Sequence, residues 1–336
     1  MQVYRGALLA GAALLFASQS LADDSSAALS AGGLELTQAA DIRMASEDLY
    51  ISPGKVRIRF AFANDSGKDI DTVVAFPLPD IDSSVFFEEP LGTITDDPVN
   101  FVGFTVVADG KRIAPQVEQR AIYNGRDVTA LLAAQHIPVN VISRKNPDIM
   151  LHLAPAQIKA LHAAGLSDGE SGEGEHPHWI IRTKFFWHQK FPARKTVVLE
   201  HSYQPVTGST FYTSYDLKDD PKNADSRHWN TNYCIDPGTL KTLAARIGPK
   251  DAKGDDGSMM EAQTTDYILT SGNNWKGPIG HFHLTLDKEK PANLLSLCWD
   301  GTLKKTGATT FEFAQDNYAP PRDIRLLVLS DIPKGG

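Results

Sequence analysis

His281 and His283 are separated by one residue, a spacing that can chelate a metal ion. On a β-strand the side chains alternate between the two faces, so both imidazoles point the same way and can bind Zn or Cu if a third ligand approaches. No nearby residue supplies that ligand, and Thr285 and Asp287 share the face. We therefore interpret this segment as a solvated polar strand face and keep the two histidines as metal candidates.

A second pair, His176 and His178, follows the carboxylates Glu173 and Glu175. Imidazoles and carboxylates together can hold a divalent cation, but this group ends an acidic, glycine-rich stretch in which a site would be poorly ordered. Neither an EF-hand loop nor a His-Glu-x-x-His helix is present. We predict no resident metal, with these two histidines as further candidates.

Glu200 and His201, together with His188, suggest acid–base chemistry, because a carboxylate beside an imidazole can poise it near neutral pH. Neighbouring residues on a strand, however, point to opposite faces. His201 alternates with Leu199 and Tyr203, on the apolar side. The pattern favours a buried core histidine over a general base.

Signals for nucleophilic catalysis are absent: the chain has no Gly-x-Ser-x-Gly elbow and no phosphate-cradling glycine loop. We predict no catalytic residue, no cofactor and no enzymatic activity. A catalytic triad is recognised by geometry and not by order in the sequence. Because seven of the ten histidines follow residue 170, a metal-dependent hydrolase stays the alternative.

Trp275 lies among turn-forming residues in the segment SGNNWKGPIG, residues 271–280. An exposed aromatic ring on a loop binds sugars, peptides or partner surfaces, so Trp275 is a candidate ligand contact. The alternative is that the ring packs beneath its own loop.

The first 22 residues have the pattern of a secretory signal peptide. Arg5 precedes an apolar run over residues 7–17, and small residues stand before a cleavage point near Ala22. No later run is long enough to span a membrane, and no cysteine near Ala22 could carry a lipid anchor. We expect a periplasmic or secreted protein.

Charge and cysteine content agree with export. Loss of Arg5 with the leader takes the formal charge from −8 to −9, which argues against a nucleic-acid or anionic-membrane partner. The chain has two cysteines, Cys234 and Cys298. In an oxidising compartment an isolated pair most simply forms a disulfide.

Most of the chain has strand patterns. Residues 55–62 alternate, with Val56, Ile58, Phe60 and Phe62 on one face and Lys55, Arg57 and Arg59 on the other, which is typical of a half-buried antiparallel strand. Asn64 begins a polar turn before a strand over residues 70–76, and Asp109-Gly110 predicts a hairpin between residues 101–107 and 112–121. Further strands are expected at residues 179–187, 196–203, 265–270, 281–286, 294–299, 309–313 and 324–329.

Helical patterns are fewer and shorter. We expect helices from an Asp127 cap to Gln135 and from Pro155 to Gly165, both packing between sheets, and a third from an Asp236 cap to Gly248. The acidic stretches at residues 167–175 and 250–258 contain almost no apolar side chain and are predicted to be mobile.

These elements predict a mostly β protein with two packed antiparallel β-sandwich-like units and a few short helices. The expected division is a signal peptide (1–22), an N-terminal β-sandwich (23–125), a helical insertion with an acidic linker (126–178) and a C-terminal β-rich unit carrying one short helix and the disulfide (179–336).

Four long segments resemble a known family: DSSAALSAGG, DIRMASEDLYISP, NDSGKDIDTVVAFPLP and WKGPIGHF, at residues 24–33, 41–53, 64–79 and 275–282. They are similar to the bacterial exported proteins grouped as domain of unknown function 4424. The resemblance implies export across the inner membrane and brings no activity, cofactor or catalytic residue.

A shorter likeness covers the strand, turn and Phe76-Pro77-Leu78-Pro79 order that ends near Tyr123. It is similar to the vault and inter-alpha-trypsin β-sandwich domain, which often precedes a von Willebrand A domain. The Asp-x-Ser-x-Ser metal motif of the latter is absent, so metal-dependent adhesion is not implied.

On these grounds we expect a non-enzymatic binding or scaffolding module whose partner is a protein or glycan of the cell envelope. The specificity of such a module would lie in loops held by rigid sheets. A second alternative is an envelope assembly or stress factor that pairs an exposed sheet edge with another chain.

The disulfide prediction has a direct test. Alkylation of the unfolded protein should add mass at Cys234 and Cys298 after reduction and add none without reductant. The measurement is intact mass spectrometry, and two freely alkylated thiols in non-reduced protein would exclude the bond.

Overall fold

The computed structural model describes residues 25–30, 33–37, 39–87, 95–142, 149–169, 174–219, 227–247 and 259–332, with side chains from residue 39 onward except at residues 86 and 87. The predicted signal peptide and the acidic stretch at residues 250–258 lie outside these ranges. The described chain is mostly β, as predicted, with four sheets and short helices.

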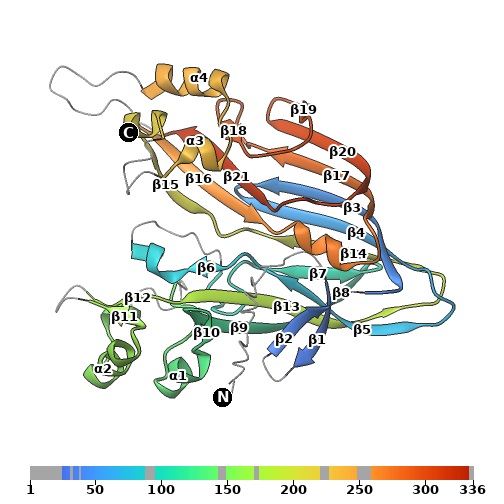
Figure 1. The fold of residues 1–336 in the computed structure, drawn as a ribbon, viewed down its shortest axis with the longest axis horizontal. Coiled ribbons are helices and arrows are strands. Elements are labelled where there is room, and N and C mark those ends of the chain that lie inside the picture. Colours follow the sequence, from blue (N-terminus) through green and yellow to red (C-terminus); the bar gives the residue numbers. More distant parts are fainter. Residues whose placement is uncertain are drawn as a thin grey trace, which may run out of the picture.

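The largest sheet has eight strands and crosses the molecule (Figure 1). In spatial order they are β19 (Lys304–Lys305), β20 (Thr310–Tyr318), β17 (Ile279–Asp287), β3 (Ile42–Ser52), β4 (Lys55–Asn64), β14 (Thr196–Tyr203), β7 (Thr105–Ala108) and β8 (Lys111–Ile113).

A seven-stranded sheet lies below it in Figure 1. Its order is β10 (Arg126–Asp127), β9 (Gln116–Tyr123), β13 (Ile180–Phe191), β5 (Ile70–Pro77), β1 (Ser25–Ser30) and β2 (Gly33–Thr37), with β6 (Ile81–Asp82) also paired to β13.

Two smaller sheets complete the β structure. One has four strands, β15 (Gly208–Tyr212), β16 (Met260–Tyr267), β21 (Ile324–Asp331) and β18 (Leu294–Ser296), and the other pairs β11 (Ser167–Asp168) with β12 (His176–Pro177). The helices are α1 (Thr129–Ala134), α2 (Pro155–Ala164), α3 (Trp229–Asn232) and α4 (Pro237–Ile247), and the 3-10 turns are η1 (Ser83–Phe87), η2 (Ile149–Leu151), η3 (Ser214–Leu217) and η4 (Thr270–Asn274).

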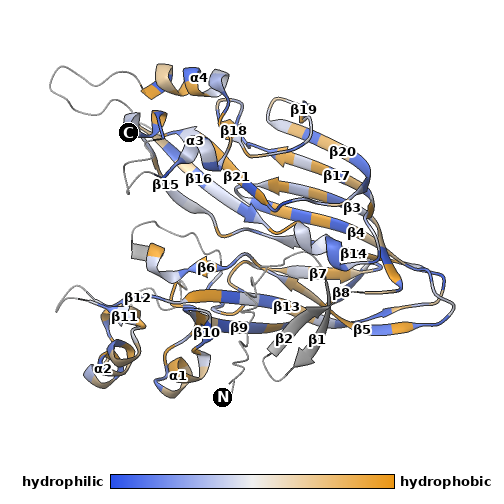
Figure 2. Ribbon diagram, in the orientation of Figure 1, coloured by the Kyte–Doolittle hydropathy of each residue, from blue (hydrophilic) through white to orange (hydrophobic). Residues whose placement is uncertain are grey.

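The inner face of the eight-stranded sheet forms the main core. Along β4, Val56, Ile58 and Phe60 are at most 2% exposed, whereas Arg57 and Arg59 between them face solvent. This is the alternation that the sequence predicts, and it shows as alternating colours along the strand in Figure 2. One face of β4 therefore packs in the core, and the other faces solvent.

Two different sheets cover that face. Phe76 of β5 packs edge-on against His201 of β14, at 5.1 Å between ring centroids, and so joins the seven-stranded sheet to the large one. Tyr267 of β16 points its hydroxyl at Glu47 of β3, 3.3 Å away, and so joins the four-stranded sheet to it. A single apolar cluster runs through all three sheets.

Strand pairing crosses the predicted domain boundaries. β14 pairs with β4 and β7, and β13 pairs with β5 and β9, so each large sheet combines residues from before position 125 and after position 179. β3 pairs with β17 in parallel, which differs from the antiparallel expectation. The two strands lie about 230 residues apart in sequence, so no hairpin turn imposes their direction. The proposed division at residues 125 and 178 stays a prediction.

Three local expectations need correction. α1 begins at Thr129 and not at an Asp127 cap, although the Asp127 carboxylate accepts the Thr129 N–H at 2.9 Å. α1 and α2 pack against β9 and β13 at the end of the seven-stranded sheet, beside Trp179 and Ile181, and not between sheets (Figure 1). The strand expected at residues 265–270 ends at Tyr267.

The acidic stretch at residues 167–175 was expected to be mobile, and its two ends are not. Glu175 is 6% exposed, and its carboxylate accepts from Ser167 Oγ at 2.7 Å and contacts His162 Nε2 at 2.6 Å. These polar contacts order the ends without apolar side chains, which composition alone could not show. Residues 170–173 lie outside the described ranges.

The disulfide prediction is confirmed. Cys234, after α3, is bonded to Cys298, after β18, with 4.9 Å between their Cα atoms. The bond ties the helical cover of the four-stranded sheet to its edge strand. Asp236 also caps α4 as expected, since its carboxylate accepts the N–H groups of Gly238 and Thr239.

The buried His201 makes stability depend on pH. Burial lowers the pKa of His201 from 6.5 to about 3, so between these values the unfolded chain binds a proton that the folded chain excludes. Stability should fall as the pH drops through this window. We expect about 2 kcal/mol to be lost from this residue between pH 7 and pH 5.

His201→Phe should reduce that pH dependence, and His188→Gln, at a 73% exposed side chain, should leave it unchanged. Urea unfolding of the three proteins at both pH values measures the difference. Equal pH slopes for wild type and His201→Phe would contradict the assignment.

Candidate ligand pocket between the sheets

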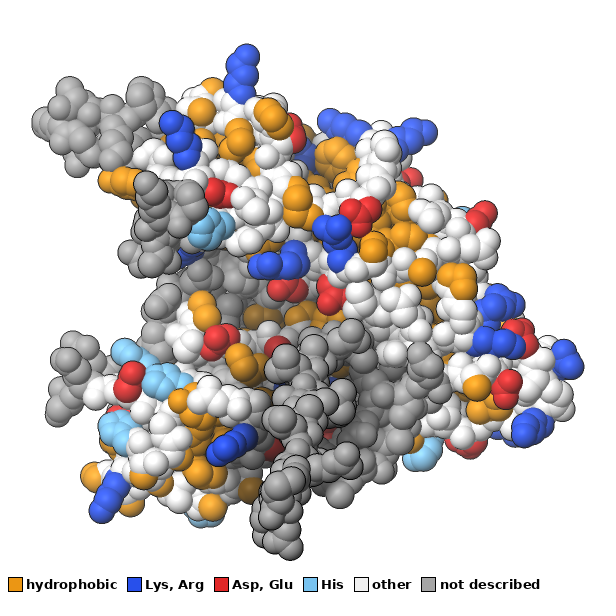
Figure 3. All heavy atoms as spheres, in the orientation of Figure 1, with side chains coloured by type: hydrophobic (Ala, Val, Ile, Leu, Met, Phe, Trp, Pro, Cys, Tyr) orange, Lys and Arg blue, Asp and Glu red, His pale blue; other side chains and the backbone are white. Residues whose placement is uncertain are grey.

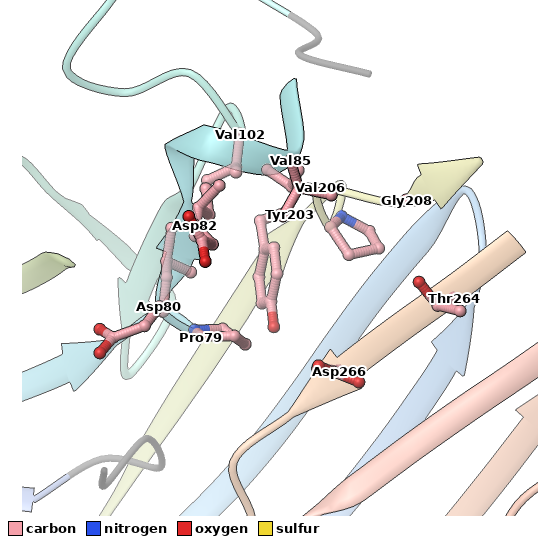
Figure 4. A pocket seen from close by; sticks show the side chains of 13 residues that line it. Pro79, Asp80, Asp82, Val85, Val102, Tyr203, Val206, Gly208, Thr264 and Asp266 are labelled. Atoms are coloured by element: carbon pink, nitrogen blue, oxygen red, sulfur yellow. The ribbon is translucent and has the colours of Figure 1, made fainter. Parts of the chain in front are cut away.

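A pocket of about 180 Å³ opens where the three main sheets meet. Its walls come from the segment between β5 and η1, the end of β14, the connection to β15, and β16 (Figure 4). Its lining is mixed, with an apolar body and three carboxylates: Leu78, Pro79, Asp80, Ile81, Asp82, Val85, Val102, Tyr203, Pro205, Val206, Gly208, Thr264 and Asp266.

Prolines shape the wall that carries two of these acids. β5 ends at Pro77, and Pro79 follows, because proline cannot donate to a strand ladder. The chain then turns through Asp80 to the short strand β6, where Ile81 and Asp82 pair with β13. Asp80 and Asp82, separated by Ile81, therefore both line this wall of the pocket.

Asp80 is already neutralised. Arg182 of β13 donates to both of its carboxylate oxygens, from Nε at 3.0 Å and from Nη2 at 2.6 Å. Hydrogen bonding to Asp80 raises the pKa of Arg182, so the pair stays ionised. Asp80 therefore contributes structure to the wall more than free charge.

Asp82 and Asp266 keep acceptor capacity. Ser84 donates both its N–H and its hydroxyl to Oδ1 of Asp82, and Oδ2 accepts no bond from the described residues. Asp266 likewise accepts no hydrogen bond from them, and its ion pair with Arg325 is long, at 3.8 Å. Desolvation raises the pKa of Asp266, with Arg325 opposing that shift. Each carboxylate can accept from a ligand.

Tyr203 is 4% exposed and stands at the centre of the lining, with its hydroxyl directed toward the side where Pro79 and Asp266 lie (Figure 4). Of the described residues that line the pocket, none is Lys, Arg or His, whereas Lys and Arg side chains lie among the acidic ones on the face of the molecule shown in Figure 3. The described lining therefore combines apolar side chains with acidic ones.

The structure places the His281 and His283 pair on the outer face of the eight-stranded sheet. His281 contacts Asp316 at 2.7 Å, and His283 contacts Asp48 at 2.9 Å. His283 also borders a broad concavity of about 630 Å³ on that face, together with Arg59. Each imidazole has its own carboxylate, as on a solvated polar strand face.

His176 and His178 lie elsewhere, on the two-stranded sheet beside α2. Both approach Asp168, at 3.6 and 3.3 Å. The structure does not bring this pair to the other, and among the residues it describes no three His, Cys, Asp or Glu side chains are grouped to hold a metal ion.

Glu200, His201 and His188 are also separated. Glu200 points outward and pairs with Arg59 at 3.5 Å, whereas His201 points into the core among Phe60, Phe76, Phe104 and Trp187. His188 lies on the exposed face of β13. The strand alternation predicted this separation.

Trp275 does not form an exposed ligand contact. It is 3% exposed and packs against Phe62, at 4.5 Å between ring centroids, and against Phe191. The turn residues around it fold the ring inward, where it seals the end of the main core. The alternative reading, a ring packed beneath its own loop, describes the structure.

The residues that line the pocket were not among the site residues predicted from the sequence. A weak signal exists in Asp80 and Asp82, which alternate directly after a proline-terminated strand. Nothing in the sequence links them to Asp266, more than 180 residues away, because only the packing of three sheets brings these segments together.

A model of the family described as "Domain of unknown function (DUF4424)" matches residues 22–327. The chain belongs to that family. The DUF4424 resemblance stated from four sequence segments is thereby confirmed, and the likeness to the vault and inter-alpha-trypsin domain is not shown by the comparisons.

Among solved structures, one from Legionella pneumophila is described as "a putative nutrient binding protein". It aligns over 87% of this DUF4424 chain and 68% of its own, with 15% identity and a TM-score of 0.41, a likeness that carries no argument about ligand. The comparison with curated proteins gave no match. No helix in the described ranges is long and apolar enough to cross a membrane.

The packing of Trp275 predicts a large loss of stability on truncation. Trp275→Ala should lower the free energy of unfolding by about 3–5 kcal/mol, the usual cost of removing a buried aromatic side chain. Leu151→Ala, at a 50% exposed side chain, serves as the control and should change it by less than about 1 kcal/mol. Chemical denaturation measures the free energy of unfolding of both variants. A loss of less than about 1 kcal/mol for Trp275→Ala would contradict the burial of its ring.

Proposed function

We propose that this DUF4424 protein is an exported, non-enzymatic binding module of the cell envelope that holds a small ligand in the pocket between its sheets. The observation that carries the proposal is the pocket itself, a concave apolar site with a few convergent polar groups on rigid strands. Such a site positions a ligand without needing a reactive group.

The size of the pocket supports a small organic ligand. A cavity of about 150 Å³ lined by aliphatic and aromatic side chains can hold a benzene ring. At about 180 Å³ this pocket has room for such a ring with a short arm, and its open mouth allows a longer ligand to extend outward.

Export is supported by the leader at residues 1–22 and by the disulfide between Cys234 and Cys298. The metal-dependent hydrolase is less well supported, since the two histidine pairs lie on separate sheets. His176 and His178 share Asp168, whereas His281 and His283 contact Asp316 and Asp48.

Assembly through sheet edges is also less well supported. The strands at the ends of the described sheet orders are short, at two to five residues: β10, β2, β19, β8, β15 and β18. Short edge strands are one way in which natural sheets avoid pairing with another chain. The pocket is therefore the better-founded site.

Binding can be tested by filling the pocket. Val206→Trp places an indole in the lining, and Gln204→Trp adds the same side chain to an exposed position of the same connection. We expect saturation-transfer NMR to detect the neutral probe 2-phenylethanol on the wild-type protein and on Gln204→Trp, with the signal lost in Val206→Trp because the cavity is occupied.

Thermal unfolding of each variant establishes that it is folded. Equal saturation of 2-phenylethanol by all three proteins would place the binding elsewhere and contradict the proposal.

A further inference from the structure

The charge of the pocket is not balanced by its own lining. Three carboxylates face it, and of these Asp80 alone is fully paired, through Arg182. Asp82 and Asp266 retain free acceptor oxygens, and no basic side chain stands among the described lining residues. A group that supplies positive charge and N–H donors would complete this arrangement.

We infer that the ligand of this pocket is an organic amine, a compact apolar body carrying one cationic nitrogen that binds to Asp266. This inference rests on the proposed function and names the chemical class of its ligand. The apolar part fits the lining of Val85, Val102 and Val206, and the nitrogen lies on the acidic side.

Asp266 is the better anchor of the two free acids. It projects from β16, and its position there is set by antiparallel pairing with Arg325 of β21. Arg325 cannot fully satisfy it, because the Arg325 guanidinium also lies over the ring of Tyr233, at 5.3 Å. The Asp266 side chain is 49% exposed, so a ligand nitrogen can approach its carboxylate from solvent.

Asp82 adds a weaker attraction from the opposite wall. Its side chain is exposed and lies on β6, while Tyr203 stands between the two walls (Figure 4). A neutral or anionic ligand of the same shape would gain the apolar contacts and leave these acids unpaired. The pocket should therefore select by charge as well as by shape.

Three probes of nearly equal shape separate these terms: phenethylamine, 2-phenylethanol and 3-phenylpropionate. Calorimetric titration at pH 7 should show phenethylamine binding about tenfold more tightly than 2-phenylethanol to the wild-type protein, with 3-phenylpropionate the weakest. Asp266→Asn should remove most of the preference for phenethylamine over 2-phenylethanol, because the anchoring carboxylate charge is lost while the side-chain shape is kept and the weaker attraction of Asp82 remains.

Asp331→Asn is the matched control. It makes the same change in net charge on the neighbouring strand β21, at a 63% exposed side chain outside the pocket. We expect it to keep the wild-type preference for phenethylamine.

The remaining outcomes are distinct. If all three probes bind the wild type equally and Val206→Trp abolishes their binding, the amine inference is overturned and the binding function stands. If Asp331→Asn weakens phenethylamine as much as Asp266→Asn does, the attraction is diffuse and the assigned anchor is wrong. If no probe binds the wild type, both proposals fail.

Discussion

The structure depends on the burial of one face of the eight-stranded sheet. That face is too wide for a single covering sheet, and its apolar side chains, such as Phe60 on β4 and Phe282 on β17, are fully buried. The seven-stranded and four-stranded sheets together cover this face, and each packs on a different part of it. Burial of this continuous core is the dominant favourable contribution to folding.

The pocket is a consequence of that division. Two covering sheets cannot meet without a junction, because twisted sheets diverge where their edges approach. At this junction Pro79 ends the pairing of one sheet, the connection through Val206 leads into the other, and Asp266 lies on its far wall. The candidate site thus lies where regular packing stops, which is a usual place for binding.

Buried polar groups in this protein lie in two kinds of surroundings. Glu175 is ordered by Ser167 and His162, whereas His201 stays neutral among aromatic rings. The contacts of Glu175 order the ends of an acidic segment, whereas the buried His201 makes the stability of the core sensitive to acid. Both are tertiary effects of residues that are distant in sequence.

The sequence by itself determined what depends on neighbouring residues and on composition. Alternation predicted β4 and the opposite orientations of Glu200 and His201, while cysteine count and the leader pattern predicted the bond between Cys234 and Cys298. Only the tertiary structure decided the burial of Trp275, the parallel pairing of β3 with β17 and the meeting of Asp82 with Asp266. The physical reason is range: strand and turn preferences act over a few residues, whereas the pocket comes from packing between segments up to about 190 residues apart.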